Sequence, residues 1–441
     1  MEDAYVIKGG VPLNGEIQLS GAKNVALKVI ISSLLFDNEV VLQNIPRIND
    51  VFELLHLIKL LGGKAEFTGQ NTVTVDGRSI NTDKVDLLHG SKIRVSFMLF
   101  APLLHKFGTC QIPNPGGCRI GARPIDRIVE GMKKLGIQID YDTETGYYKA
   151  KMNQKPEGKY SFNKPSHTGT ELMILISVFG KNSIELINSA LEPEVDELIR
   201  FLNDSGAQIK RNGSKIIIYG VTVLHQKNPF SIISDRNEAI TYATLAIATK
   251  GSITISSIPY SLIETFVKIL QKAGGGFNKI SNTTFNFYYK EDLRAVDIET
   301  APHPGFMTDW QPNWAILMTQ AKGNSIIHER VFENRFSYVD ELRKLGMEIE
   351  YVKVPVTDPF EYFFFNFDPS KKYNQAIRIT GSQQIHSGVL TILDLRAGAT
   401  LAIAALISDG ESVVNGASIL DRGYEDFIGK ITKLGGNIKK L

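Results

Sequence analysis

Charged and polar side chains stand at the start of several strongly apolar segments of this sequence. They are Lys23 with Asn24, Arg94, Asp235 with Glu238, Asp309, and Asp394 with Arg396. The apolar segments carry hydrophobic residues on all sides at helical spacing, which predicts buried helices. Helix N-termini present free N–H donors and the positive end of the helix dipole. We therefore predict an anion-binding site where these helix starts converge.

Further arginines fall in loops that follow predicted strands, namely Arg123, Arg335 and Arg422. With Lys23, Arg94 and Arg396 they would supply up to six fixed cations. A guanidinium group binds phosphate or carboxylate through two parallel N–H donors, so the set suits a substrate that carries both groups. Each residue alone fits a surface ion pair equally well, but recurrence at equivalent places favours a shared site.

The segment 113–124 (PNPGGCRIGARP) combines three prolines and three glycines with one cysteine. This composition predicts a loop that takes unusual backbone dihedrals and can close over a site. Arg119 and Arg123 would favour the thiolate of Cys118, which is a candidate acid, base or nucleophile, or else an incidental loop cysteine. Cys110 lies in an apolar stretch and is predicted to be a buried core residue.

Asp309 follows a proline-rich approach to a predicted helix. A carboxylate at this place could act as a general base or as a helix N-cap, and the residue types leave both roles open. No second His or Cys stands at ligand spacing from His167, so we predict no metal site.

A short pattern occurs six times: an amphipathic helix, a glycine that ends it, and a strand. The glycines are Gly62, Gly136, Gly206, Gly274, Gly346 and Gly435, about 75 residues apart on average. Each is predicted to be a left-handed helix C-cap. One of the buried helices lies upstream of each glycine, so the chain is predicted to consist of six repeated α/β units.

The sixth unit ends after a single strand, and strands predicted at 5–8 and 16–19 are expected to complete it. This predicts two domains of three units each. One comprises residues 1–22 with 234–441, and the other comprises residues 23–233 and carries the Cys118 loop.

Charge and composition exclude several classes of protein. The 441 residues hold 49 Lys and Arg against 47 Asp and Glu, a formal net charge of +2. This balance gives no general attraction to nucleic acid or to anionic membranes. There is no apolar run of membrane-spanning length and no signal-peptide pattern. Two cysteines are too few for a disulfide scaffold, so we expect a cytoplasmic protein, with no obligate protein partner evident.

Six motifs together resemble those of the UDP-N-acetylglucosamine enolpyruvyl transferases, over nearly the whole chain. They are SGAKN (20–24), PGGCRIGARPID (115–126), TAPHPGFMTDWQ (300–311), VFENRF (331–336), DLRAGA (394–399) and DRGYE (421–425). The resemblance implies a two-domain inside-out α/β barrel of six βαβαββ-type units. It implies transfer of the enolpyruvyl group of phosphoenolpyruvate to the 3′-hydroxyl of UDP-N-acetylglucosamine, by addition and elimination with release of phosphate. This is the first committed step of peptidoglycan synthesis, and it needs no metal or organic cofactor.

The resemblance also implies a role for each matched residue. Cys118 is implied as the acid that protonates the methylene carbon of phosphoenolpyruvate and as the target of fosfomycin, and Asp309 as the base at the sugar hydroxyl. Phosphoenolpyruvate is implied to be held by Lys23, Asn24, Arg123, Arg335, Arg396 and Arg422. Contacts to the UDP-sugar are implied for Arg94, Arg123, Pro124, Ile125, Asp126, Lys164, Ser166 and Val331. The substrate-binding set is completed at helix starts by Asp235, Glu238 and Asp394.

The sequence departs from the family pattern in three places. Residues 166–170 read SHTGT where SVGAT is usual, Ile419 stands where many members have His, and 358–375 is longer and more aromatic. The altered 166–170 segment leaves open an enolpyruvyl transferase with a different acceptor alcohol. A weakly catalytic sugar-nucleotide-binding paralogue is a further alternative, against which the retained Cys118, Asp309 and arginines argue.

Overall fold

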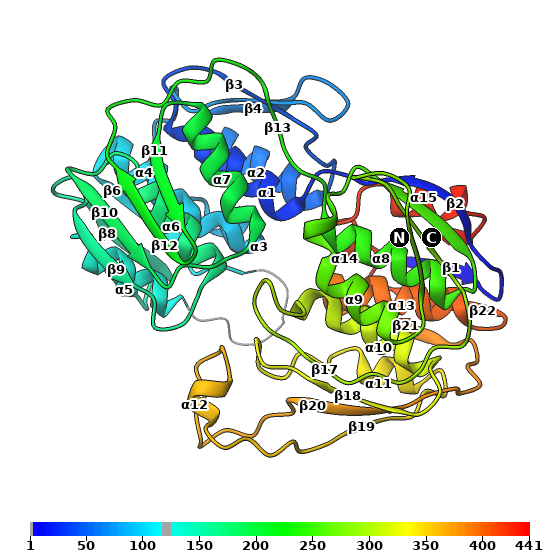
Figure 1. Cartoon of the computed structure of the whole chain (residues 1–441). Coiled ribbons are helices and arrows are strands. Elements are labelled where there is room, and N and C mark those ends of the chain that lie inside the picture. Colours follow the sequence, from blue (N-terminus) through cyan, green and yellow to red (C-terminus); the bar gives the residue numbers. More distant parts are fainter. Residues whose placement is uncertain (1–2, 117–124) are drawn as a thin grey trace. The chain divides into compact units, whose positions relative to one another are not determined.

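Helices and small β-sheets alternate along the chain in the computed structural model, which describes residues 3–116 and 125–441 (Figure 1). The described residues divide into two units. Unit 1 contains residues 3–20 and 234–441, and unit 2 contains residues 21–116 and 125–233. The chain therefore crosses between units at 20/21 and 233/234, within two residues of the crossings expected from the repeats.

Unit 1 is built from both ends of the described chain. Its helices are α8 (Arg236–Ala248), α9 (Glu264–Lys272), α10 (Gln311–Thr319), α11 (Val339–Arg343), α12 (Pro359–Tyr362), α13 (Leu395–Ile407), α14 (Ala417–Leu420) and α15 (Phe427–Lys433), with 3-10 turns η3 (Tyr260–Leu262) and η4 (Thr308–Trp310). Its strands are β1 (Ala4–Lys8), β2 (Asn14–Gln18), β14 (Ser252–Ser256), β15 (Gly276–Lys279), β16 (Phe285–Tyr288), β17 (Ile298–Glu299), β18 (Asn324–His328), β19 (Ile349–Tyr351), β20 (Ala376–Thr380), β21 (Val389–Thr391), β22 (Glu411–Asn415) and β23 (Asn437–Lys440).

The described strands of unit 1 form three sheets, with the orders β21-β22-β1-β23, β15-β16-β14-β2 and β17-β18-β20-β19. Helices α8, α10 and α13 pack against one another. Every residue of α8 and of α10 is buried, as their all-round apolar sequences predict. The buried helices thus form the core of the unit, and their N-termini are held in fixed positions.

Unit 2 repeats this plan. Its helices are α1 (Lys23–Ser32), α2 (Asn49–Leu60), α3 (Leu87–Lys92), α4 (Phe100–Phe107), α5 (Asp126–Lys134), α6 (His167–Ser177) and α7 (Pro193–Asp204), with 3-10 turns η1 (Ser33–Leu35) and η2 (Arg94–Leu99). Its strands are β3 (Val40–Gln43), β4 (Lys64–Phe67), β5 (Val73–Asp76), β6 (Thr109–Pro113), β7 (Gln138–Asp142), β8 (Tyr147–Lys151), β9 (Gly158–Ser161), β10 (Ser183–Ile187), β11 (Gln208–Asn212), β12 (Lys215–Tyr219) and β13 (Phe230–Ser231). The sheet orders among these described strands are β11-β12-β10-β9, β13-β3-β5-β4 and β6-β8-β7.

The six helix-ending glycines of the repeat all adopt the predicted left-handed conformation. Their φ angles run from +88° at Gly346 to +104° at Gly206. Residues with a side chain rarely adopt this conformation, which explains why glycine recurs at the same place in each unit. The repeat, and with it the α/β class, is confirmed.

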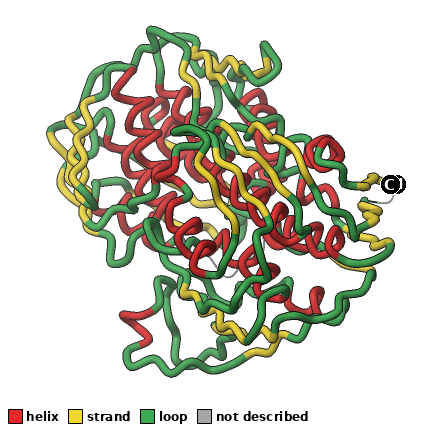
Figure 2. The backbone as a smooth tube through the Cα atoms, turned by 45° about the vertical axis from the view of Figure 1, so that its right-hand side comes forward, coloured by secondary structure: helices red, strands yellow, loops and turns green. Residues whose placement is uncertain are grey.

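The first strand completes the last sheet, as predicted. Strand β1 lies between β22 and β23 and runs antiparallel to both. Both ribbon views accordingly show the two chain ends side by side (Figures 1 and 2).

The strand predicted at 16–19 joins a different sheet from the one expected. Strand β2 pairs in parallel with β14, and in unit 2 β13 pairs in parallel with β3. In the sheet that contains β9 and β10, the strand at the corresponding edge, β9, directly precedes the buried helix α6 and pairs in parallel with the strand that follows that helix. Because the chain crosses between units after β2 and after β13, each of these strands fills the place that the other would have taken.

Candidate functional site

The starts of three buried helices of unit 1 meet around Arg396. Asp235 caps α8 by accepting from the amide of Asn237 over 2.7 Å, and Asp394 caps α13 by accepting from the amide of Arg396 over 3.0 Å. The side chain of Arg396 lies 3.7 Å from Oδ2 of Asp235 and 3.9 Å from Oδ2 of Asp309. The predicted convergence of Asp235, Asp309, Asp394 and Arg396 is therefore present within this unit.

Asp309 is paired with the second arginine of the cluster. Nη2 of Arg335 donates to Oδ1 of Asp309 over 2.7 Å, and Nη1 donates to the hydroxyl of Thr308 over 2.8 Å. Met307 and Trp310 occupy the N-cap positions of η4 and α10. Asp309 is thus not the helix cap, and its carboxylate, 22% exposed, faces the arginines. The N-cap role is therefore not observed, and the role of general base stays a prediction.

Burial and charge act in opposite directions on the two guanidinium groups. Burial alone would lower the pKa of Arg396, but Tyr424, Asp235 and Asp309 raise it overall. Burial likewise opposes the charge of Arg335, whereas Asp309, Asp394 and Glu329 raise its pKa overall. Both arginines therefore keep a full positive charge inside the protein.

Two buried N–H groups of these arginines are suited to binding a ligand. Nε of Arg335 and Nη1 of Arg396 are buried and have no hydrogen-bond acceptor among residues 3–116 and 125–441. A buried unsatisfied donor costs about 1–3 kcal/mol, and more when it is charged. An anionic ligand oxygen would remove this cost, so the cluster is suited to phosphate or carboxylate.

The other predicted residues of unit 1 occupy different surroundings. The carboxylate of Glu238 is buried and accepts from the amide of Ser20 over 2.7 Å and from Nζ of Lys430 over 2.5 Å; burial raises its pKa against the pull of Lys430. These contacts favour a structural role that fixes the segment before the crossing. Val331 and Arg422 are partly exposed in loops.

In unit 2 the predicted cations lie on packed neighbouring elements. Lys23 opens α1, and its Nζ lies 2.6 Å from Oδ2 of Asp50. Arg94 opens η2, which packs on α1, and burial lowers the pKa of its guanidinium group. Asn24 is partly exposed on the first turn of α1. Lys23, Asn24 and Arg94 are thus positioned by one helix and the turn that packs on it.

The predicted UDP-sugar contacts of unit 2 gather at the start of α6 and α5. Ser166 caps α6 by accepting from the amide of Gly169 over 3.3 Å, and Lys164 precedes it in the same loop. Asp126 is exposed at the first position of α5, directly after the buried Ile125. Helices α5 and α6 pack together. The remaining predicted residues, Cys118, Arg123 and Pro124, lie outside the residues that the structure describes.

Sequence reasoning missed the residues that stand behind the two arginines. Tyr424 hydrogen-bonds Thr241 over 2.8 Å, and its ring lies 5.3 Å from the guanidinium carbon of Arg396. Glu329 is fully buried and accepts from the hydroxyl of Thr308 over 2.8 Å. Tyr424 lay in the quoted DRGYE motif, and Glu329 was signalled only as a glutamate directly after the apolar alternating strand β18.

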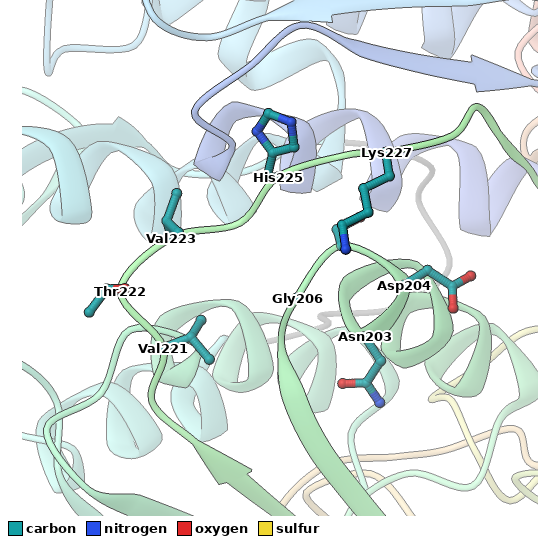
Figure 3. A pocket seen from close by; sticks show the side chains of 9 residues that line it. Asn203, Asp204, Gly206, Val221, Thr222, Val223, His225 and Lys227 are labelled. Carbon is teal, nitrogen blue, oxygen red and sulfur yellow. The ribbon is translucent and has the colours of Figure 1, made fainter.

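An open pocket on unit 2 is lined by none of the predicted site residues. It has a volume of about 390 Å³ and is lined by Asn203–Gly206, Val221–Val223, His225 and Lys227 (Figure 3). His225 there pairs with Asp37 over 2.8 Å.

Within the described ranges, no group of three or more His, Cys, Asp or Glu residues could hold a metal ion. None of the described helices is long and apolar enough to cross a membrane.

Comparison with known proteins places this architecture in one family. The family pattern described as EPSP synthase (3-phosphoshikimate 1-carboxyvinyltransferase) matches residues 7–431. Proteins from Thermodesulfovibrio yellowstonii and Idiomarina loihiensis, both named UDP-N-acetylglucosamine 1-carboxyvinyltransferase, are 34% and 35% identical to the chain. The alignment covers 100% of the chain in both cases, and 100% and 99% of the two relatives respectively.

Solved structures show the same fold. The enolpyruvyl transferase NikO from Streptomyces tendae superposes with a TM-score of 0.86 at 21% identity, covering 100% of this chain and 99% of that one. An EPSP synthase from Acinetobacter baumannii superposes with a TM-score of 0.72 at 16% identity, covering 100% of both chains.

Proposed function

The chain belongs to the EPSP synthase (3-phosphoshikimate 1-carboxyvinyltransferase) family, and on that premise we propose that it is a UDP-N-acetylglucosamine 1-carboxyvinyltransferase. The reaction joins the 3′-oxygen of UDP-N-acetylglucosamine to C2 of phosphoenolpyruvate while C3 gains a proton. The bond from C2 to the phosphate oxygen then breaks, C3 loses a proton, and phosphate leaves. The products are the enolpyruvyl ether of the sugar nucleotide and inorganic phosphate.

One observation carries the proposal beyond the relatives' names. Asp309 stands beside Arg335 and Arg396, each of which has a buried N–H with no acceptor in the described part of the chain. Acyclic phosphates with a carboxylate, such as phosphoenolpyruvate, offer the acceptors that two arginines bind best. A carboxylate next to those cations is in the right surroundings to take a proton from an attacking hydroxyl.

The roles of the residues follow from their chemistry. Arg335 and Arg396, with Arg422, Arg123, Lys23 and Asn24, bind the carboxylate and phosphate of phosphoenolpyruvate. These cations stabilise the more concentrated charge of the tetrahedral intermediate better than that of either substrate, and this difference lowers the barrier. Arg94, Lys164 and Ser166 with the 123–126 segment and Val331 contact the sugar nucleotide.

Cys118 protonates C3 of phosphoenolpyruvate and is the thiol that the epoxide fosfomycin alkylates. The flanking Arg119 and Arg123 support this assignment, because they favour the thiolate. The activity would belong to peptidoglycan synthesis, hence to cell-wall formation, cell shape and cell division, in the cytoplasm.

Phosphate release with both substrates tests the proposal. The purified chain should release one phosphate per phosphoenolpyruvate consumed, and only when UDP-N-acetylglucosamine is present. Shikimate 3-phosphate in place of the sugar nucleotide is the control acceptor and should give no release. A folded protein that turns over neither pair, or only the shikimate pair, would overturn the assignment.

A further inference from the structure

A buried carboxylate joins the loop after β18 to the start of η4. Glu329 is 0% exposed. Its Oε1 accepts from the backbone amides of Val331 and Phe332 over 2.7 and 3.0 Å. Its Oε2 accepts from the hydroxyl of Thr308 over 2.8 Å. One side chain therefore fixes both the turn that leads to Arg335 and the residue that precedes Asp309.

The hydroxyl of Thr308 transmits this constraint to the arginine. A hydroxyl has one proton to donate and two lone pairs that accept. Because Glu329 takes the proton, Oγ of Thr308 presents a lone pair to Nη1 of Arg335, 2.8 Å away. Nη2 of the same guanidinium donates to Asp309 over 2.7 Å. Glu329, Thr308, Arg335 and Asp309 thus form one continuous hydrogen-bonded chain.

The direction of these hydrogen bonds is set by the charges of Glu329 and Arg335. Glu329 can only accept while it is ionised, and Arg335 can only donate. Burial raises the pKa of Glu329 overall, although Arg335, Thr308 and the two backbone amides act to lower it. Arg335 is itself only 4% exposed.

We propose that Glu329 is a positioning residue for enolpyruvyl transfer, acting through Thr308 to set the guanidinium of Arg335 against Asp309. The expected loss of kcat rests on the proposed function, whereas the expected displacement of Arg335 does not. Glu329 itself touches no substrate, since its carboxylate oxygens already accept from Thr308, Gln311, Val331 and Phe332. It controls where the arginine and the base stand when the hydroxyl attacks.

Glu329→Gln separates this role from simple support of the loop. The amide oxygen of glutamine can still accept from the Val331 and Phe332 amides, so the turn is retained. Its NH2 group faces Thr308 as a donor, and the threonine proton loses its acceptor. We expect kcat to fall about ten- to hundredfold, because small displacements of catalytic groups have costs of this size. KM for UDP-N-acetylglucosamine should change less than about threefold, since uniform binding is unaffected.

Thr308→Val removes the link itself and completes a double-mutant cycle. Residues of one hydrogen-bonded chain are not additive. We therefore expect Thr308→Val to lose activity to a similar extent, and the double variant to lose little more than either single one. Thr308→Ser, which keeps the hydroxyl, should restore most of kcat.

Glu341→Gln is the matched control. Glu341 is a largely buried glutamate of the same unit, 9% exposed, that accepts from the amide of Thr391 over 2.8 Å and binds Lys344. It should lose stability without loss of kcat. Additive losses in the Glu329 and Thr308 cycle, or an equal loss of kcat in Glu341→Gln, would overturn the positioning role.

A crystal structure of Glu329→Gln tests the same inference without turnover. We expect the Arg335–Asp309 hydrogen bond to be broken or shifted in it. An unchanged Arg335 in the variant would refute the proposal even if the wild-type protein is active. A displaced Arg335 in the variant, together with a wild-type protein that shows no turnover, would refute only the assigned function.

Discussion

Arg335 donates from Nη2 to Oδ1 of Asp309 over 2.7 Å, so a buried cation is hydrogen-bonded to the carboxylate that we propose as the base. The same guanidinium keeps its Nε free of any acceptor among the described residues. One side of the guanidinium group thus holds Asp309, while another side remains able to bind an anionic oxygen.

Asp309→Asn should abolish most of the turnover while the protein still binds its sugar nucleotide. The amide keeps the shape and an acceptor for Arg335 but cannot take a proton. General-base catalysis contributes about 10²–10⁴ in rate, and kcat should fall by that factor. Phosphate release gives kcat, and calorimetry gives the affinity for UDP-N-acetylglucosamine. Asp292→Asn, on the surface beside Lys322, is the control, and near-normal turnover of Asp309→Asn would remove this residue from the mechanism.

Fosfomycin should label Cys118 and leave Cys110 unmodified. Cys110 is 1% exposed in β6, and burial raises the pKa of its thiol well above the usual range. The thiolate is the reactive form, so this residue should not react in the folded protein. Mass spectrometry of peptides from the treated protein identifies the site. Cys118→Ser should lose most activity and all labelling, and Cys110→Ala should keep both; label confined to Cys110 would reverse the assignment.

Unit 2 should become less stable as the pH falls from 6.5 to 4. His105 packs edge-on against Phe179, with its Nε2 2.9 Å from the carbonyl oxygen of Ile176, and burial lowers its pKa to about 4. In this pH range the unfolded chain binds a proton that the folded chain does not. The free energy of unfolding therefore decreases with falling pH, by up to about 3 kcal/mol from this group.

His105→Gln tests this origin, because glutamine can donate to Ile176 but does not titrate. Urea unfolding at pH 7 and pH 4.5 should show a smaller pH dependence for the variant than for the wild type. Equal slopes for His105→Gln and wild type would exclude His105 as the source.

Gly136→Ala should destabilise the protein through backbone strain alone. Gly136 has a φ of +90°, and a Cβ placed on it meets no atom within 4 Å. The left-handed conformation costs a residue with a side chain about 1–2 kcal/mol, and asparagine less. Thermal unfolding should thus rank wild type above Gly136→Asn and Gly136→Asn above Gly136→Ala. An alanine variant as stable as the wild type would show that the helix end relaxes without cost.

The repeat was predictable because its signals are local. A glycine after an amphipathic helix predicts a left-handed helix cap, and a helix that is apolar on all sides predicts burial. Neither prediction depends on residues far away in the sequence. The same reasoning placed Asp235, Asp309 and Asp394 at helix starts, and the buried helices then brought them together around Arg396.

Contacts between distant segments could not be predicted in this way. The parallel pairing of β2 with β14 depends on where the chain crosses between units. The hydrogen bonds from Glu329 through Thr308 to Arg335 depend on how a loop and a helix start pack. All three are residue types that are common on protein surfaces, so the sequence gives no sign of their contacts. The ion pair of Lys23 with Asp50 likewise joins helices whose approach no sequence period encodes.

The place of β1 between β22 and β23 has a consequence for biosynthesis. Among the described strands, β1 leaves the ribosome first, and its two partners β22 and β23 leave it last. Residues 21–233 contain every strand of their own three sheets and can complete them before the rest of the chain is made. Strand β1 meanwhile remains unpaired, with an open edge. Such an edge is prone to pair with other chains. Nascent-chain stalls after residue 233 should therefore capture a folded central unit that carries an N-terminal segment bound by chaperones.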